Sequence, residues 1–163
     1  MFDKFGEMDS AAELNELAEN LFNEGDYESI RTMAKENGIA GDYVEAYIEG
    51  EVPVLCDELT AALGKLEAEK KETEVKGLIA DWVSYIEAQC LENEQMAAAV
   101  RRKGKRLKTC LGRLLEFSFK NRMKVDPEIV KEAKITGARV EFGIPGMAEA
   151  KKIIRTYYLG GRS

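Results

Sequence analysis

The chain has 163 residues, of which 45% are hydrophobic and 33% are charged, a balance typical of globular proteins. Histidine is absent, which removes the commonest general base and the commonest transition-metal ligand, so an enzymatic or metal-dependent function is not expected. The net charge of −6 is the sum of two opposed fields, because residues 1–99 carry −17 and residues 100–163 carry +11. This asymmetry favours charged partners over small-molecule chemistry.

Residues 1–50 are predicted to form a small acidic unit of three helices. Ser10 caps the first helix and Asp26 the second, while glycines at positions 25, 38 and 50 end the three helices in turn. The carboxylates that lie outside the apolar helix faces form either a solvated surface or a surface that resembles the phosphate backbone of a nucleic acid and binds a basic partner. The candidates for the second role are Glu13, Glu16, Glu24 and Glu28.

Residues 51–163 are predicted to form a compact helical domain. A helix begins at Pro53 and runs to Leu66, and residues 67–74 form a polar connector. The next helix, over residues 75–91, carries Trp82 in an apolar stripe, which indicates a core residue. Three scattered thiols in apolar helical patterns indicate buried, reduced cysteines and a cytoplasmic protein. These thiols are Cys56, Cys90 and Cys110. Because histidine and CxxC pairs are both absent, neither a metal site nor a cofactor is expected.

The C-terminal part contains helices around one extended segment. After a helix over residues 105–122, with Leu115 predicted to face inward, Asp126 and Pro127 begin a short helix. Residues 136–143 alternate apolar and charged side chains, which predicts an extended stretch. A last helix begins near Met147, which is also predicted to face inward. The predicted fold class is therefore mostly α, with at most one short β-hairpin or extended segment near 136–143.

The densest run of charge lies at residues 101–108, where six of eight side chains are cationic. Together with cations on the following helix and the last helix, this run is typical of a surface that neutralises a phosphate backbone. A solvated helix face is the alternative. No sequence-reading motif for nucleic acid accompanies the run. The candidate binding residues are Arg101, Arg102, Lys103, Lys105, Arg106, Lys108, Arg113, Lys152 and Arg155.

Residues 92–123 and 144–160 resemble the PcfK-like proteins of conjugative and other mobile elements. The resemblance rests on residues 94–111, EQMAAAVRRKGKRLKTCL, in which an Ala-rich helix, a Lys-containing link and a helix with an early Cys follow one another. The ending from Met147 to the paired Tyr157 and Tyr158 resembles the closing helix of that family. The family includes anti-CRISPR proteins that inhibit type II RNA-guided nucleases.

The resemblance implies a non-enzymatic anti-CRISPR protein of a phage or mobile element. Its expected partner is a type II CRISPR RNA-guided nuclease, alone or with its guide RNA or DNA, and it would block target DNA binding or cleavage. An alternative is a nucleic-acid-binding accessory protein that acts through its basic C-terminal region. A third interpretation is that the opposed charge fields pair within the chain or between copies, giving a homo-oligomer. None of these functions requires a membrane.

Overall fold

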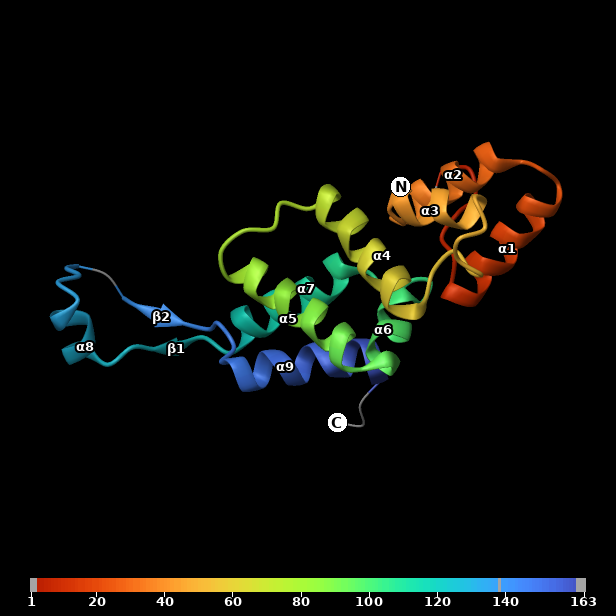
Figure 1. Cartoon of the computed structure of the whole chain (residues 1–163). Helices are drawn as coiled ribbons and strands as arrows, with labels where there is room; N and C mark the ends of the chain where they lie inside the picture. Colours follow the sequence, from red (N-terminus) through yellow and green to blue (C-terminus); the bar gives the residue numbers. More distant parts are fainter. Residues whose placement is uncertain (1–2, 138, 161–163) are drawn as a thin grey trace.

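The computed structural model describes residues 3–137 and 139–160 and has a mostly helical fold, as the sequence predicted (Figure 1). The acidic N-terminal helices pack around a core that includes Leu14, Ile30 and Val44. Ser10 and Asp26 cap the first two helices as predicted, each accepting a hydrogen bond from a main-chain N–H three residues later. The helices are α1 (Ala11–Asn23), α2 (Tyr27–Glu36) and α3 (Gly41–Ile48).

A second core lies among five further helices, and Trp82 is buried in it, as predicted. A single residue, Asn93, ends one of these helices and caps the next, so the chain turns a corner without a loop. All three cysteines are buried and unpaired, which also confirms the prediction. The helices are α4 (Glu58–Glu72), α5 (Leu78–Glu92), α6 (Glu94–Arg101), α7 (Leu107–Lys120) and α9 (Met147–Arg155), followed by a π-helical turn, η1 (Thr156–Gly160).

Helix α4 belongs to both cores. Its Ala61 packs with the N-terminal helices, while the next residue, Ala62, and Leu66 pack in the second core. The turn after α2 also lies directly on α4, because a Cβ added at Gly38 would come within 1.9 Å of the carbonyl oxygen of Gly64. Gly38 has φ +76°, so both its conformation and its surroundings require glycine. The two cores are therefore joined by backbone contact and not by a tether.

The boundaries predicted for α4 are wrong at both ends. The helix begins after Asp57, which caps it, and not at Pro53. It continues as far as Glu72, into the segment 67–74 that was predicted to be a polar connector. The charged composition concealed the continuation, because Lys65 and Glu69 lie four residues apart on one helix face and both point into the protein.

Residues 121–137 and 139–146 belong to an arm that projects from the helical body, shown at the left of Figure 1. Two antiparallel strands, β1 (Met123–Lys124) and β2 (Glu141–Phe142), make its stem, and α8 (Pro127–Glu132) lies at its tip. This confirms the predicted extended segment and the helix start at Asp126, although Ala138 lies outside the described residues. The second strand of the pair was not predicted.

The base of the arm is fixed to α7 and exposes apolar side chains around it. A Cβ at Gly143 would come within 1.8 Å of the carbonyl oxygen of Ser118, so the stem and the end of α7 are in backbone contact. Leu115 and Met147 were predicted to face inward, but they are 56% and 51% exposed. Leu115 lies in the second half of α7, which precedes the arm, and Met147 is the first residue of α9, directly after the arm.

Candidate nucleic-acid interface

The basic run 101–108 does not form one exposed surface. Arg101 is fully buried between the two cores, where its guanidinium donates to the main-chain oxygens of Met8, Asn37 and Ala61 and to the side-chain oxygen of Asn37. Burial lowers the pKa of Arg101, but a guanidinium keeps its proton under all ordinary conditions. The prediction that Arg101 binds a partner is therefore wrong, since its side chain joins the N-terminal unit to the helical body.

A second buried cation lies beside Arg101. The ammonium of Lys65 is 2.7 Å from a carboxylate oxygen of Glu7 and donates to the main-chain oxygen of Arg102 at 2.7 Å. The other oxygen of Glu7 pairs with Arg106 at 3.1 Å. Burial lowers the pKa of Lys65, because desolvation outweighs the attraction of Glu7. Glu7 therefore brings the acidic and basic fields into contact within the chain, which agrees with intramolecular pairing at this point.

Glu69 occupies the far side of the same buried region. One of its carboxylate oxygens accepts a hydrogen bond from the main-chain N–H of Leu107 at 3.0 Å, at the first turn of α7. Burial raises the pKa of Glu69, and this effect exceeds the opposing effects of the hydrogen bond and of the nearby cations. The carboxylate substitutes for an N-cap, since Arg106 supplies no side-chain cap to α7.

Lys105 and Arg106 are held by the C-terminal turn. The ammonium of Lys105 donates to the main-chain oxygen of Tyr157 at 2.6 Å, and the main-chain N–H of Arg106 donates to the Tyr157 hydroxyl at 2.7 Å. The guanidinium of Arg113 lies over the same ring, 5.0 Å from its centroid. These contacts secure η1 against α7. Lys105 and Arg106, both half-buried, are therefore committed to the fold, whereas Arg113 keeps an exposed edge.

Three further predicted cations, Arg102, Lys103 and Lys108, are exposed but lie near carboxylates. The link residues Arg102 and Lys103 are next to Asp9, whose carboxylate accepts a hydrogen bond from the main-chain N–H of Lys103. Lys108 lines a small hollow that also contains Glu69 and Glu72. Acidic neighbours therefore reduce the positive field along the link and at the start of α7.

The clearest unneutralised cations lie on α9. Lys152 and Arg155 are exposed as predicted, and they line a shallow hollow of about 450 Å³ together with Lys151 and Leu159. The Lys151 ammonium also lies 5.2 Å from the ring centroid of Tyr85. None of these three cations forms an ion pair with another described residue. Lys151 was missed in the sequence, although its position four residues before Arg155 places both on one helix face.

The acidic candidates are all exposed, but two already have partners. The side chain of Glu13 accepts from the main-chain N–H of Asp9, and Glu28 pairs with Arg31. Glu16 and Glu24 make no such contact with the described residues. The four carboxylates are spread along α1 and the start of α2, at the end of the molecule away from the arm (Figure 1).

No family model, curated protein or solved structure matches this chain. No described helix is long and apolar enough to span a membrane. Within residues 3–137 and 139–160, no three Cys, Asp or Glu side chains are grouped as a metal site would need. Lys151, Lys152 and Arg155 are exposed, line one hollow and form no ion pair with another described residue, which makes this α9 surface the strongest candidate site in the described chain.

Proposed function

We propose that the protein is a non-enzymatic nucleic-acid-binding protein that contacts the phosphate backbone through its α9 surface. The observation that supports this proposal is that Lys151, Lys152 and Arg155 lie together, are exposed and have no carboxylate partners among the described residues. Cations on one rigid helix bind phosphates with little loss of backbone entropy. Because phosphates are the same at every base pair, such a surface binds without reading sequence.

Binding to phosphates through the α9 surface should make the affinity for duplex DNA depend strongly on salt concentration. If the α9 surface neutralises three phosphates, the affinity for duplex DNA should fall about 40-fold between about 50 and 200 mM salt. Arg113, exposed at one edge beside Tyr157, would add a further contact and steepen the dependence. Measuring fluorescence anisotropy of a labelled duplex at several salt concentrations gives this slope directly.

A charge reversal tests which surface is used. The double variant Lys152→Glu/Arg155→Glu should abolish binding at low salt, whereas Lys71→Glu/Lys76→Glu, with the same change in net charge on the α4–α5 side, should retain most of it. All four side chains are exposed, so both variants should fold. Equal losses in the two variants, or no binding by the wild type at low salt, would refute the proposal.

A narrower second proposal follows from the resemblance to PcfK-like proteins, namely an anti-CRISPR protein that binds a type II RNA-guided nuclease. Residues 94–111, which carry the resemblance, form α6, the cationic link and the start of α7. The exposed Glu16 and Glu24 lie on the acidic unit, distant along the molecule from the arm, and they suit a positively charged channel (Figure 1). The arrangement allows one molecule to contact protein and nucleic acid at different places.

The nuclease proposal is tested by a cleavage assay with purified type II nuclease and guide. Inhibition should be lost in Glu16→Lys/Glu24→Lys and retained in Glu74→Lys/Glu132→Lys, which changes the net charge equally at exposed carboxylates outside the segments that carry the resemblance. Cleavage unimpaired by excess protein, without co-elution, would exclude it. The DNA-binding proposal would survive that result, because its assay contains no nuclease.

A further inference from the structure

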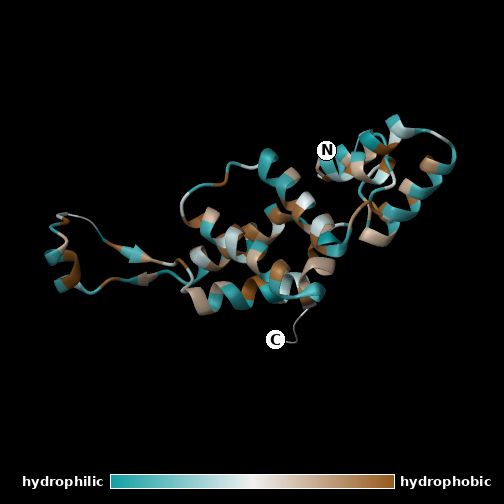
Figure 2. Ribbon diagram, viewed as in Figure 1, coloured by the Kyte–Doolittle hydropathy of each residue, from teal (hydrophilic) through white to brown (hydrophobic). Residues whose placement is uncertain are grey.

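The stem of the arm is amphipathic, yet nothing covers the outer part of its apolar face. Met123 is paired with Phe142, and in an antiparallel ladder directly opposed residues point to the same side. The next pair, Lys124 and Glu141, therefore points to the other side. In globular proteins such an alternation packs the apolar face on a core, but here Met123 and Phe142 are 68% and 62% exposed. Figure 2 shows that hydrophilic and hydrophobic residues both occur along the arm.

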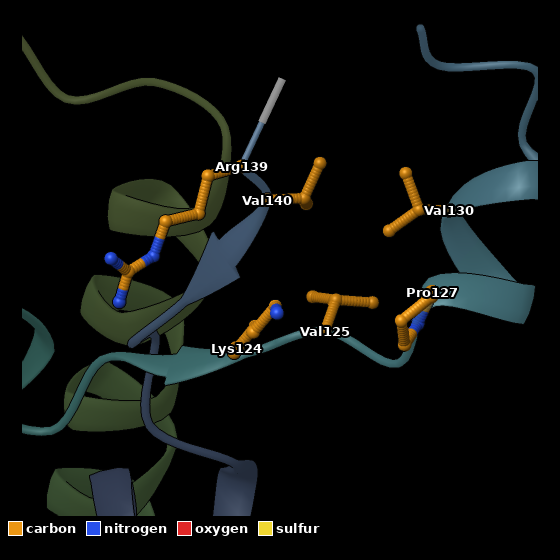
Figure 3. A pocket seen from close by; sticks show the side chains of 6 residues that line it. All are labelled: Lys124, Val125, Pro127, Val130, Arg139 and Val140. Carbon is orange, nitrogen blue, oxygen red and sulfur yellow. The ribbon is translucent and has the colours of Figure 1, made fainter. Parts of the chain in front are cut away.

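The tip of the arm covers only the far end of this face. Val125 donates its main-chain N–H to Val140, and both side chains are half-buried towards Val130 and Pro127 of α8 (Figure 3). The hollow between them is open, with a volume of about 570 Å³. A two-stranded ribbon with so little burial is marginal by itself, so a covering surface would stabilise the arm.

We infer that this apolar face pairs with the same face of a second copy of the chain across a two-fold axis. The charge of the arm is compatible with a second copy as the occupant, because residues 121–146 carry five cations and four carboxylates and two arms therefore do not repel each other. The acidic N-terminal unit and the cationic α9 surface would each repel a copy of itself, so the arm is the part of the chain best suited to self-association.

The exposed apolar area is sufficient for a weak dimer. Met123 and Phe142 lie on this face, and Ile144, two residues after Phe142, continues it. The three side chains are 59–68% exposed, and each presents on the order of 100 Å². Two copies would bury about 600 Å² of apolar surface, and since roughly 60% of an interface is apolar, the whole contact would reach about 1,000 Å², the lower limit for a specific interface.

Sedimentation velocity of the whole chain between about 1 and 200 µM tests the inference. The wild type should form a dimer with a dissociation constant in the micromolar range, and the dimer should persist at about 1 M salt, because apolar contacts are not screened. The double variant Met123→Thr/Phe142→Thr should weaken the dimer at least tenfold while leaving the melting temperature of the body unchanged. Threonine keeps the strand propensity of the stem.

The matched control is Leu91→Thr, which removes an equally exposed apolar side chain, 65% accessible, from the end of α5. It should dimerise like the wild type. A wild type that stays monomeric at the highest concentration would overturn the inference and assign the face to a different protein. Association that vanishes in high salt, grows beyond a dimer, or is unaffected by the Met123 and Phe142 changes would also overturn it.

Discussion

Replacing Arg101 by Met tests whether the two cores are joined through this buried guanidinium. Its four hydrogen bonds, three of them to main-chain oxygens of Met8, Asn37 and Ala61, span residues far apart in the sequence. Hydrogen bonds to a charged group contribute about 1.5–3 kcal/mol each, but burying the charge costs several kcal/mol in return. Methionine fills much of the volume but removes a donor from the buried carbonyl oxygens of Met8 and Asn37. Each buried acceptor left unpaired costs about 1–3 kcal/mol, so we expect a loss of about 3–5 kcal/mol.

Urea denaturation measures this loss with two probes. Trp82 fluorescence reports on the second core, and far-UV circular dichroism reports on all helices. The wild-type transitions should coincide, whereas Arg101→Met should unfold α1–α3 at lower urea than the core around Trp82. The matched control is Arg102→Met, which removes an exposed neighbouring cation and should cost less than about 0.5 kcal/mol.

Two results would refute the reasoning about Arg101. If Arg101→Met and Arg102→Met have free energies of unfolding within about 1 kcal/mol of each other, the buried hydrogen bonds do not secure the interface. If Arg101→Met loses duplex binding but keeps wild-type stability, the side chain serves a ligand and not the fold.

Three further predictions concern packing and titration. Gly38→Ala should lower the free energy of unfolding by about 3 kcal/mol, because the new methyl group would meet the Gly64 carbonyl, whereas Gly41→Ala, with open space around it, should have little effect in a thermal melt. Glu69 has a raised pKa, so just above pH 4.5 the folded state binds more protons than the unfolded state. The free energy of unfolding should therefore fall as the pH rises through that range. The variant Glu69→Gln should flatten this decline, which urea midpoints at several pH values measure. Burial raises the pKa of all three thiols to about 12, so the folded protein should not react with Ellman's reagent at pH 8, and urea should expose all three: Cys56, Cys90 and Cys110.

Local signals in the sequence predicted most of the helices, because their caps are short-range. Ser10, Asp26 and Asp126 each accept a main-chain N–H at the helix start where the sequence placed them. The two errors in α4 have different causes. Pro53 resembles a helix start, but Asp57 four residues later caps the helix. The charged run after Leu66 resembles a linker, but Glu69 is buried against other elements and the helix continues to Glu72.

The candidate site was harder to predict, because a run of cations does not reveal which members are buried. Arg101 and Arg102 are adjacent and identical in type, yet one is fully buried and the other exposed. The difference arises from the carbonyl oxygens of Met8 and Asn37, which only the folded chain brings together. The arm was predicted only in part for the same reason. The alternation around Val140 indicates an extended segment, but it does not reveal the strand that pairs with it.

The shared position of α4 limits how this protein can have been assembled during evolution. Recombination that joined an acidic module to a helical one at Gly50 would have left Ala61, Lys65 and Arg101 facing a foreign surface. Both joined segments would also have needed a glycine at the point of contact, one at position 38 and the other at position 64. The first 50 residues are therefore expected to have diverged together with α4 and α6. A chimera that takes its N-terminal unit from a related chain should fold only when α4 and α6 come from that same chain.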